Sequence, residues 1–90
     1  MCGIVGVFNS KQAQEQVKRA LAVLKNRGRD GSNVLKINET CSLGHTLHAV
    51  VSRVAQPIKK EGILTANCEI YNWQELNKKY NFNAKNDADL

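Results

Sequence analysis

Cys2 is the residue whose chemistry stands out in this sequence, because it directly follows the initiator methionine. A side chain this small usually allows Met1 to be removed, which leaves a thiol and a free α-amino group on one residue. An α-amino group titrates near pH 8, so part of it is neutral in a cell and can accept a proton. A thiol activated by its own amine is an N-terminal nucleophile. Most cysteines only pack in protein interiors, so this interpretation depends on the rest of the chain.

The chain after this cysteine predicts elements that can hold it in place. Residues 3–8 are apolar and β-branched, as in a buried strand. Asn9 and Ser10 offer an N-cap, and apolar side chains then recur at helical spacing. We expect this helix to end near Asn26, with Gly28 as its stop. A helix laid on a strand is the first layer of an α+β fold.

Shorter elements are expected further along. Residues 27–31 form a turn in which glycine supplies positive φ, and Arg27 and Asp30 are expected to be a pair that orders this loop and not catalytic groups. His45, on a mostly apolar strand, is expected to be a core histidine with satisfied hydrogen bonds. Strands are expected at 34–37, 42–51 and 62–66, with a hairpin turn at 38–39, a break at 56–57, a helix at 73–79 and an N-cap at 86–87.

Composition narrows the class of protein. No apolar run approaches the length of a membrane span, and no basic leader precedes the apolar run that follows Cys2, so we expect a cytoplasmic protein without a membrane partner. The three cysteines, Cys2, Cys41 and Cys68, have no metal-ligand spacing. We therefore expect free thiols and no metal site.

The charge distribution is uneven. Residues 1–60 carry ten Lys or Arg against three acids, whereas residues 61–90 carry three against five. A basic segment can bind nucleic acid. However, Phe8 is the only aromatic residue before residue 61, so there is no platform on which bases could stack. We expect a solvated surface and no nucleic-acid partner.

Five segments, taken in order, resemble the class II glutamine amidotransferases, and most closely the glutaminase domain of asparagine synthetase. Glu69-Ile70-Tyr71-Asn72 followed by Trp73-Gln74-Glu75-Leu76 is the feature that favours asparagine synthetase within that class. The resemblance runs the whole length of the chain. Its segments are Met1 to Phe8, Arg27 to Gly31, Leu43-Gly44-His45, Gln56-Pro57 and Asn67 to Asn72.

This resemblance implies an N-terminal-nucleophile hydrolase fold, a sandwich of two sheets between helix layers. Residues 1–90 would be the N-terminal part of such a domain, so we expect the sandwich to be incomplete. The implied reaction is hydrolysis of glutamine to glutamate and ammonia through a γ-glutamyl thioester. The implied partner is an ATP-dependent synthetase domain or subunit, which would use ATP and Mg²⁺ and is not expected within these residues. No cofactor is expected in this chain, and a homo-oligomer is left open.

The resemblance also implies roles for individual residues. Cys2 would be the nucleophile, and the side chain of Asn67 with the backbone N–H of Cys68 would stabilise the oxyanion. Family members have glycine in place of Cys68. If the backbone at this position has positive φ, the Cβ atom of cysteine would cost about 1 kcal/mol or more. Asp87 would bind the substrate's α-ammonium, and Glu69 would line the same pocket.

Leu47 departs from the family pattern. The family motif Leu-Gly-His-x-Arg-Leu has an arginine that pairs with the substrate's α-carboxylate, whereas this chain has Leu47 at that position. Leucine cannot replace a guanidinium. His48 or Arg53 would then have to supply the cation. The sequence therefore leaves two hypotheses open: an active glutaminase domain, or a module of the same fold that regulates or docks a subunit without catalysis.

Overall fold

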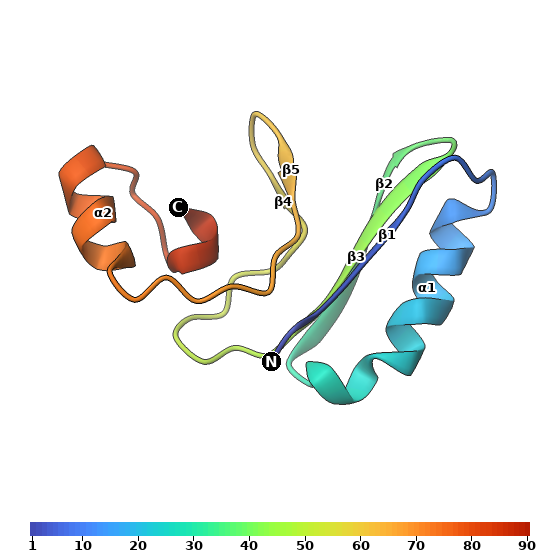
Figure 1. The fold of residues 1–90 in the computed structure, drawn as a ribbon, viewed down its shortest axis with the longest axis horizontal. Coiled ribbons are helices and arrows are strands. Elements are labelled where there is room, and N and C mark those ends of the chain that lie inside the picture. The colour runs from blue at the N-terminus through green and yellow to red at the C-terminus, as the bar shows by residue number, and fades with distance from the viewer.

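The computed structural model describes all of residues 1–90 and divides them into a layered half and a looped half (Figure 1). The layered half contains strand β1 (Gly3–Val7), helix α1 (Ala13–Val23), the 3-10 helix η1 (Lys25–Arg27) and strands β2 (Gly31–Asn38) and β3 (Cys41–Leu47). The looped half contains strands β4 (Ile58–Lys59) and β5 (Ile63–Leu64), helix α2 (Trp73–Tyr80) and the 3-10 helix η2 (Asp87–Asp89).

Strand β3 is the centre of an antiparallel sheet with the order β1-β3-β2. Its register pairs Ile4 with His45 on one side and Leu35 with Leu43 on the other. The predicted hairpin turn joins β2 to β3, and the N–H of Thr40 donates to Oδ1 of Asn38 at 2.9 Å. The beginning of the chain is thus fixed against a strand that lies forty residues away in sequence.

Helix α1 covers one face of this sheet. Val17 and Leu21 are buried, and both lie against Gly44 on β3. A Cβ atom at Gly44 would lie 2.5 Å from Cγ1 of Val17. The glycine therefore lets the helix approach the central strand closely, which confirms the predicted layer of helix on sheet.

The opposite face of the sheet remains partly open. Gly3 faces α1, so Ile4 and Gly6 point to the other side, where the ring of Phe8 lies over Gly6. Ile4 is 48% exposed and Phe8 is 64% exposed. The second sheet consists only of β4 paired with β5, on the side of the first sheet away from α1 (Figure 1). An α+β class is therefore confirmed.

Residues 48–90 are held together with little apolar core. Of the 14 buried residues, only Gln56, Asn86 and Ala88 follow Leu47, and α2 has no buried residue. The strand expected at 62–66 is shorter than predicted. Only Ile63 and Leu64 form β5, and the residues on either side of them lie in loops. The predicted second helix is confirmed, although it extends one residue further, to Tyr80.

Two expectations about α1 and the turn after it were wrong in detail. The helix begins after Gln12, whose N–H donates to Oγ of Ser10 at 3.3 Å, and it ends at Val23.

Gly28 has a φ of −151°, so it does not stop the helix in a left-handed conformation. Its Cβ would instead lie 2.5 Å from the carbonyl carbon of Thr46. No glycine has positive φ; Asn9, Asn81 and Asn83 do.

Candidate active site

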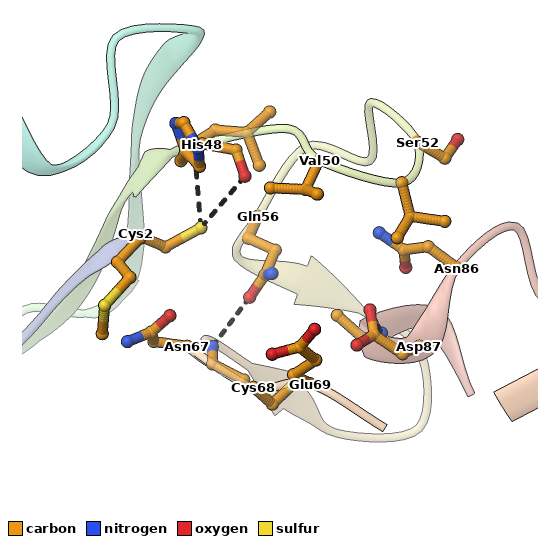
Figure 2. Close-up of a pocket in the computed structure, with 15 residues that line it drawn as sticks. Cys2, His48, Val50, Ser52, Gln56, Asn67, Cys68, Glu69, Asn86 and Asp87 are labelled. Carbon is orange, nitrogen blue, oxygen red and sulfur yellow. Dashed lines mark hydrogen bonds between the residues drawn. The ribbon is translucent and has the colours of Figure 1, made fainter. Parts of the chain in front are cut away.

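A cavity of about 410 Å³ lies where the start of β1, the end of β3 and the looped half meet (Figure 2). Its volume is within the range of small-molecule sites. Six of the seven residues singled out from the sequence line it: Cys2, His48, Asn67, Cys68, Glu69 and Asp87. The seventh, Arg53, does not. Residues 65 positions apart in the chain, Cys2 and Asn67, therefore share one cavity.

Cys2 is fixed on two sides. The backbone N–H of His48 donates to its Sγ at 3.3 Å (Figure 2), and Nε of Arg27 donates to its carbonyl oxygen at 3.2 Å. Arg27 and Asp30 form no ion pair with each other, so the expected pairing was wrong, but each orders the loop as predicted: a carboxylate oxygen of Asp30 accepts from the N–H of Ala49 at 2.8 Å. Both side chains order the backbone around the cavity.

The segment that contains Asn67 and Cys68 is held at Ala66 by two buried side chains. Oε1 of Gln56 accepts from the N–H of Ala66 at 2.7 Å, and Nε2 of His45 lies 3.2 Å from its carbonyl oxygen. Gln56 is 4% exposed and His45 is 1% exposed. Because a carbonyl can only accept, Nε2 of His45 carries the proton. Ala66 thus has both of its backbone polar groups occupied immediately before the predicted oxyanion residues.

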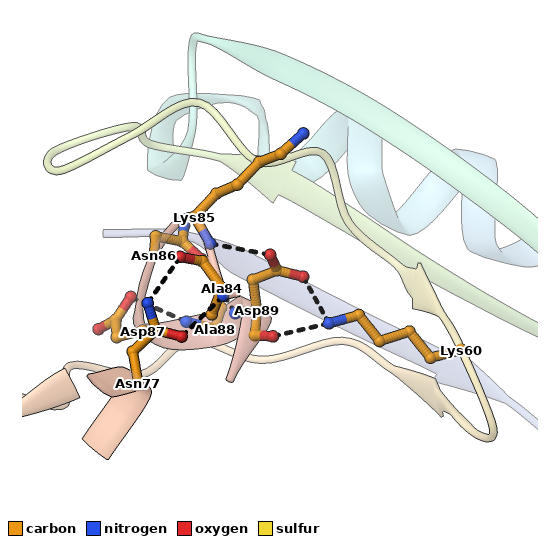
Figure 3. Close-up of polar contacts among 8 residues, drawn as sticks. All are labelled: Lys60, Asn77, Ala84, Lys85, Asn86, Asp87, Ala88 and Asp89. Atoms are coloured by element: carbon orange, nitrogen blue, oxygen red, sulfur yellow. Dashed lines mark hydrogen bonds and ion pairs between the residues drawn. The ribbon is translucent and has the colours of Figure 1, made fainter. Parts of the chain in front are cut away.

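The same segment is held at its other end by Asp87. Oδ2 of Asp87 accepts from the N–H of Ile70 at 2.9 Å, and Oδ1 accepts from the N–H of Ala88 at 2.9 Å. The predicted N-cap at Asn86 is confirmed, since its Oδ1 accepts from the N–H of Asp89 at 3.0 Å (Figure 3). Only Asn67, Cys68 and Glu69 lie between the two anchored positions, and all three line the cavity.

His45 was predicted to be a core histidine with satisfied hydrogen bonds, and this is only half correct. Its Nδ1 is buried and has no hydrogen-bond partner. Burial lowers the pKa of the imidazole, and the hydrogen bond with Ala66 acts against that shift. His45 is therefore a neutral link between β3 and the segment that carries Asn67.

Cys68 is exposed, yet its environment disfavours the thiolate. Partial burial raises the pKa of its thiol, and the charges of Asp87 and Cys2 raise it further. The backbone of Cys68 does not have positive φ. The strain expected from placing a side chain at the family's glycine position therefore does not arise.

The two candidate cations lie differently with respect to the cavity. His48 lines it, whereas Arg53 donates a hydrogen bond to the carbonyl oxygen of Asp30. Leu47 is 7% exposed and contributes an apolar part of the wall. The position of the family's arginine is thus apolar in this chain, and Arg53 is already engaged elsewhere.

Sequence reasoning missed the part that Gln56 plays. We interpreted Gln56-Pro57 only as a break between elements, yet Gln56 lines the cavity and fixes Ala66. Residues 50–52 and Asn86 also line the cavity and were not predicted. A signal existed for Gln56 alone, because it belongs to one of the segments on which the family resemblance rests.

A comparison with protein-family models gives a match over nearly the whole chain. The matching model describes a glutamine amidotransferase domain and covers residues 1–89. The chain belongs to this family. No curated protein and no solved structure is similar enough to the chain to count as a match. Within this family domain, neither α1 nor α2 has the length and apolar character that a membrane-spanning helix needs.

Proposed function

We propose that this chain is the N-terminal part of a glutamine-hydrolysing domain of the asparagine-synthetase type. The observation that carries the proposal is the shared cavity of Cys2, Asn67 and Cys68, because a nucleophile and oxyanion donors must face one reacting carbon. Membership of the glutamine amidotransferase family supports the same chemistry.

The reaction begins when the free α-amine of Cys2 accepts the thiol proton and the sulfur attacks the side-chain amide carbon of glutamine. Negative charge then develops on the amide oxygen, and fixed donors lower the energy of that state. The side-chain amide of Asn67 and the backbone N–H of Cys68 are the proposed donors. Ammonia leaves as the γ-glutamyl thioester forms, and water then releases glutamate.

The amino-acid end of glutamine needs groups of both charges. Asp87 is the proposed partner of the α-ammonium, with Glu69 beside it on the cavity wall. His48 is the proposed partner of the α-carboxylate, because it lines the cavity and Arg53 does not. The lack of a guanidinium in the cavity leads us to expect weaker binding of free glutamine than an arginine would give.

The open face of the first sheet supports a longer domain. A sheet face that leaves Ile4 48% exposed and Phe8 64% exposed is normally covered by another layer. Further strands would complete the N-terminal-nucleophile hydrolase sandwich. We assign use of ATP and Mg²⁺ to a synthetase domain or subunit that receives the ammonia, and no cofactor to residues 1–90.

A thiol-reactive glutamine analogue tests the proposal directly. In protein from which Met1 has been removed, a diazoketone analogue is expected to add once per chain, at Cys2, and excess glutamine is expected to slow the reaction. The matched control is the same chain with Met1 retained, which has the thiol but no free amine on it. Equal labelling of Cys2→Ala and the parent chain would show that the analogue reacts elsewhere and would refute the mechanism.

Leu47 favours a second candidate, a module that keeps the fold without catalysis. An apolar wall at the position of the family's arginine gives the α-carboxylate no bidentate partner. The substitution Leu47→Arg separates the two candidates. If it produces labelling that the parent chain lacks, the non-catalytic module is correct; if the parent is labelled without it, the active domain is correct.

A further inference from the structure

Two of the three cysteines, Cys2 and Cys68, line the same cavity. Each is close in sequence to a residue that is tied to His45. Ile4, two residues after Cys2, is the register partner of His45 on β3. Ala66, two residues before Cys68, meets Nε2 of His45 through its carbonyl oxygen. Because consecutive Cα atoms are about 3.8 Å apart, the Cα atom of each cysteine lies within about 7.6 Å of the Cα atom of its anchored residue.

The surroundings of the two thiols differ. Sγ of Cys2 accepts a hydrogen bond from the N–H of His48 at 3.3 Å and donates one to the carbonyl oxygen of His48 at 3.8 Å, so this sulfur is held at the end of β3. Burial and the charges of Asp87 and Cys2 raise the pKa of Cys68, so its thiol stays protonated near neutral pH. The charge of one thiol thus acts on the other. Cys2 is the thiol that an oxidant attacks first, and Cys68 is the neighbour that responds.

We propose that Cys2 and Cys68 form a reversible disulfide when the protein meets a peroxide. The peroxide transfers one oxygen to the sulfur of Cys2, which gives a sulfenic acid and releases water or an alcohol. The sulfur of Cys68 then attacks the sulfenic sulfur. The S–S bond forms, the S–O bond breaks, and the proton of Cys68 leaves with the hydroxyl as water. The two thiols are oxidised by two electrons, and the peroxide is reduced by two.

The consequence for activity rests on the proposed function. A disulfide ties up the sulfur that would attack glutamine, and a thiol reductant restores it. The bond also protects Cys2 from further oxidation to sulfinic acid, which is irreversible in most proteins. Cys68 thus changes an irreversible loss into a reversible one, and glycine at that position could not do so.

Peptide mapping without reductant tests the bond itself. Trypsin cuts after Lys and Arg, so the three cysteines fall in three separate peptides: residues 1–11 (2–11 once Met1 has been removed), 37–53 and 61–78. After treatment with hydrogen peroxide, we expect a monomer lighter by two hydrogens and a cross-linked species of 1–11 with 61–78. A reductant should release both peptides.

Two variants make the result specific. Cys68→Ser should abolish the cross-linked species, and because the position is exposed the change should leave the urea-unfolding midpoint nearly unchanged. Cys41→Ser, which removes the buried cysteine outside the cavity, should leave the cross-linked species unchanged. A link that includes 37–53, a link between two chains, or an oxidised 1–11 peptide beside a free 61–78 thiol would each overturn the proposal.

Labelling with the glutamine analogue separates this inference from the proposed function. Oxidised parent protein should regain its labelling after reduction, whereas oxidised Cys68→Ser should not. If the reduced parent is never labelled but the cross-link still forms, the glutaminase mechanism is wrong and the disulfide stands. If labelling is normal and no cross-link forms, the reverse holds.

Discussion

In residues 1–47 a helix lies across a three-stranded sheet, whereas residues 48–90 contain two strands of two residues, one short helix and long connecting segments. The first half is stabilised by apolar side chains such as Val17 and Leu21 between its layers. The second half is stabilised by side chains that bind backbone groups, such as Gln56 to Ala66 and Asp87 to Ile70.

This difference teaches how the cavity is built. Its first wall, at Cys2 and His48, lies directly beside the ends of the paired strands β1 and β3. Its second wall, at Asn67 to Glu69, belongs to a loop whose position depends on a few hydrogen bonds. A change in the first half should therefore affect the whole fold, and a change in the second should act locally on the cavity.

The largest effect is expected from Gly28→Ala. The new Cβ would lie 2.5 Å from the carbonyl carbon and 2.6 Å from the carbonyl oxygen of Thr46, and backbone atoms cannot turn aside. We expect a loss of about 3 kcal/mol or more in the free energy of unfolding, measured by urea denaturation. Gly62→Ala in the looped half is the control, since its Cβ meets nothing within 4 Å. Similar losses in both variants would contradict the comparison.

A smaller and local effect is expected from Gln56→Ala. The N–H of Ala66 would lose its acceptor in a part-buried position, at a cost of about 1–3 kcal/mol. Hydrogen exchange measured by NMR should speed up at Ala66 and its neighbours, while the amides of β3 remain protected. Gln56→Glu keeps an oxygen acceptor and should retain more of the protection. Uniform acceleration along the chain would show that the two halves unfold as one unit.

The contact between the halves at His45 predicts a dependence on pH. The folded state holds His45 neutral because burial lowers the pKa of the imidazole. As the pH falls below 6.5, the ordinary pKa of histidine, His45 takes up a proton in the unfolded state before it does so in the folded state. The free energy of unfolding therefore decreases as the pH falls from 6.5 to the lowered pKa of the folded state. The slope from one group cannot exceed about 1.4 kcal/mol per pH unit. His45→Gln should flatten this part of the urea-stability profile; an unchanged profile would assign it to other groups.

The smallest effect is expected at the ion pair of Lys60 with Asp89 (Figure 3), whose Nζ–Oδ1 distance is 2.9 Å. The hydrogen bond from Lys60, with one from the backbone of Lys85, lowers the pKa of Asp89. The stabilisation that this ion pair gives is present at pH values above 3.8, the ordinary pKa of an aspartate. It is lost as the pH falls through the lowered pKa of Asp89. Lys60→Met should cost at most about 1 kcal/mol, because Lys60 is exposed.

The same variant should move the carboxylate titration of Asp89, followed by NMR, back toward 3.8. Lys59→Met is the matched control, because Lys59 is the neighbour of Lys60, is exposed and forms no ion pair. A shift of the Asp89 titration in the control as large as in Lys60→Met would mean that general charge, and not the contact, holds the pKa down.

Much of this molecule could be predicted from its sequence where the information is local. The apolar periodicity of α1, the hairpin turn at Asn38 and the N-cap at Asn86 all depend on residues a few positions apart. The order of the family segments also predicted that Cys2 and Asn67 would line a common pocket.

Other features depend on contacts that a linear pattern does not contain. Gly28 is required by the nearby backbone of Thr46, and not by its own φ. Gln56 and His45 both bind Ala66, and nothing in their own neighbourhoods indicates that partner. Arg53 and His48 are both candidates for binding the α-carboxylate near the same strand end, and only the folded chain distinguishes the one that lines the cavity.

The start of α2 at Trp73 has a practical consequence. The only tryptophan and both tyrosines, Tyr71 and Tyr80, follow residue 48. Intrinsic fluorescence therefore observes only the looped half, whereas circular dichroism in the far ultraviolet is dominated by the longer helix and the sheet. An experimenter who records both optical signals during one denaturation can watch the two halves separately, without attaching a dye.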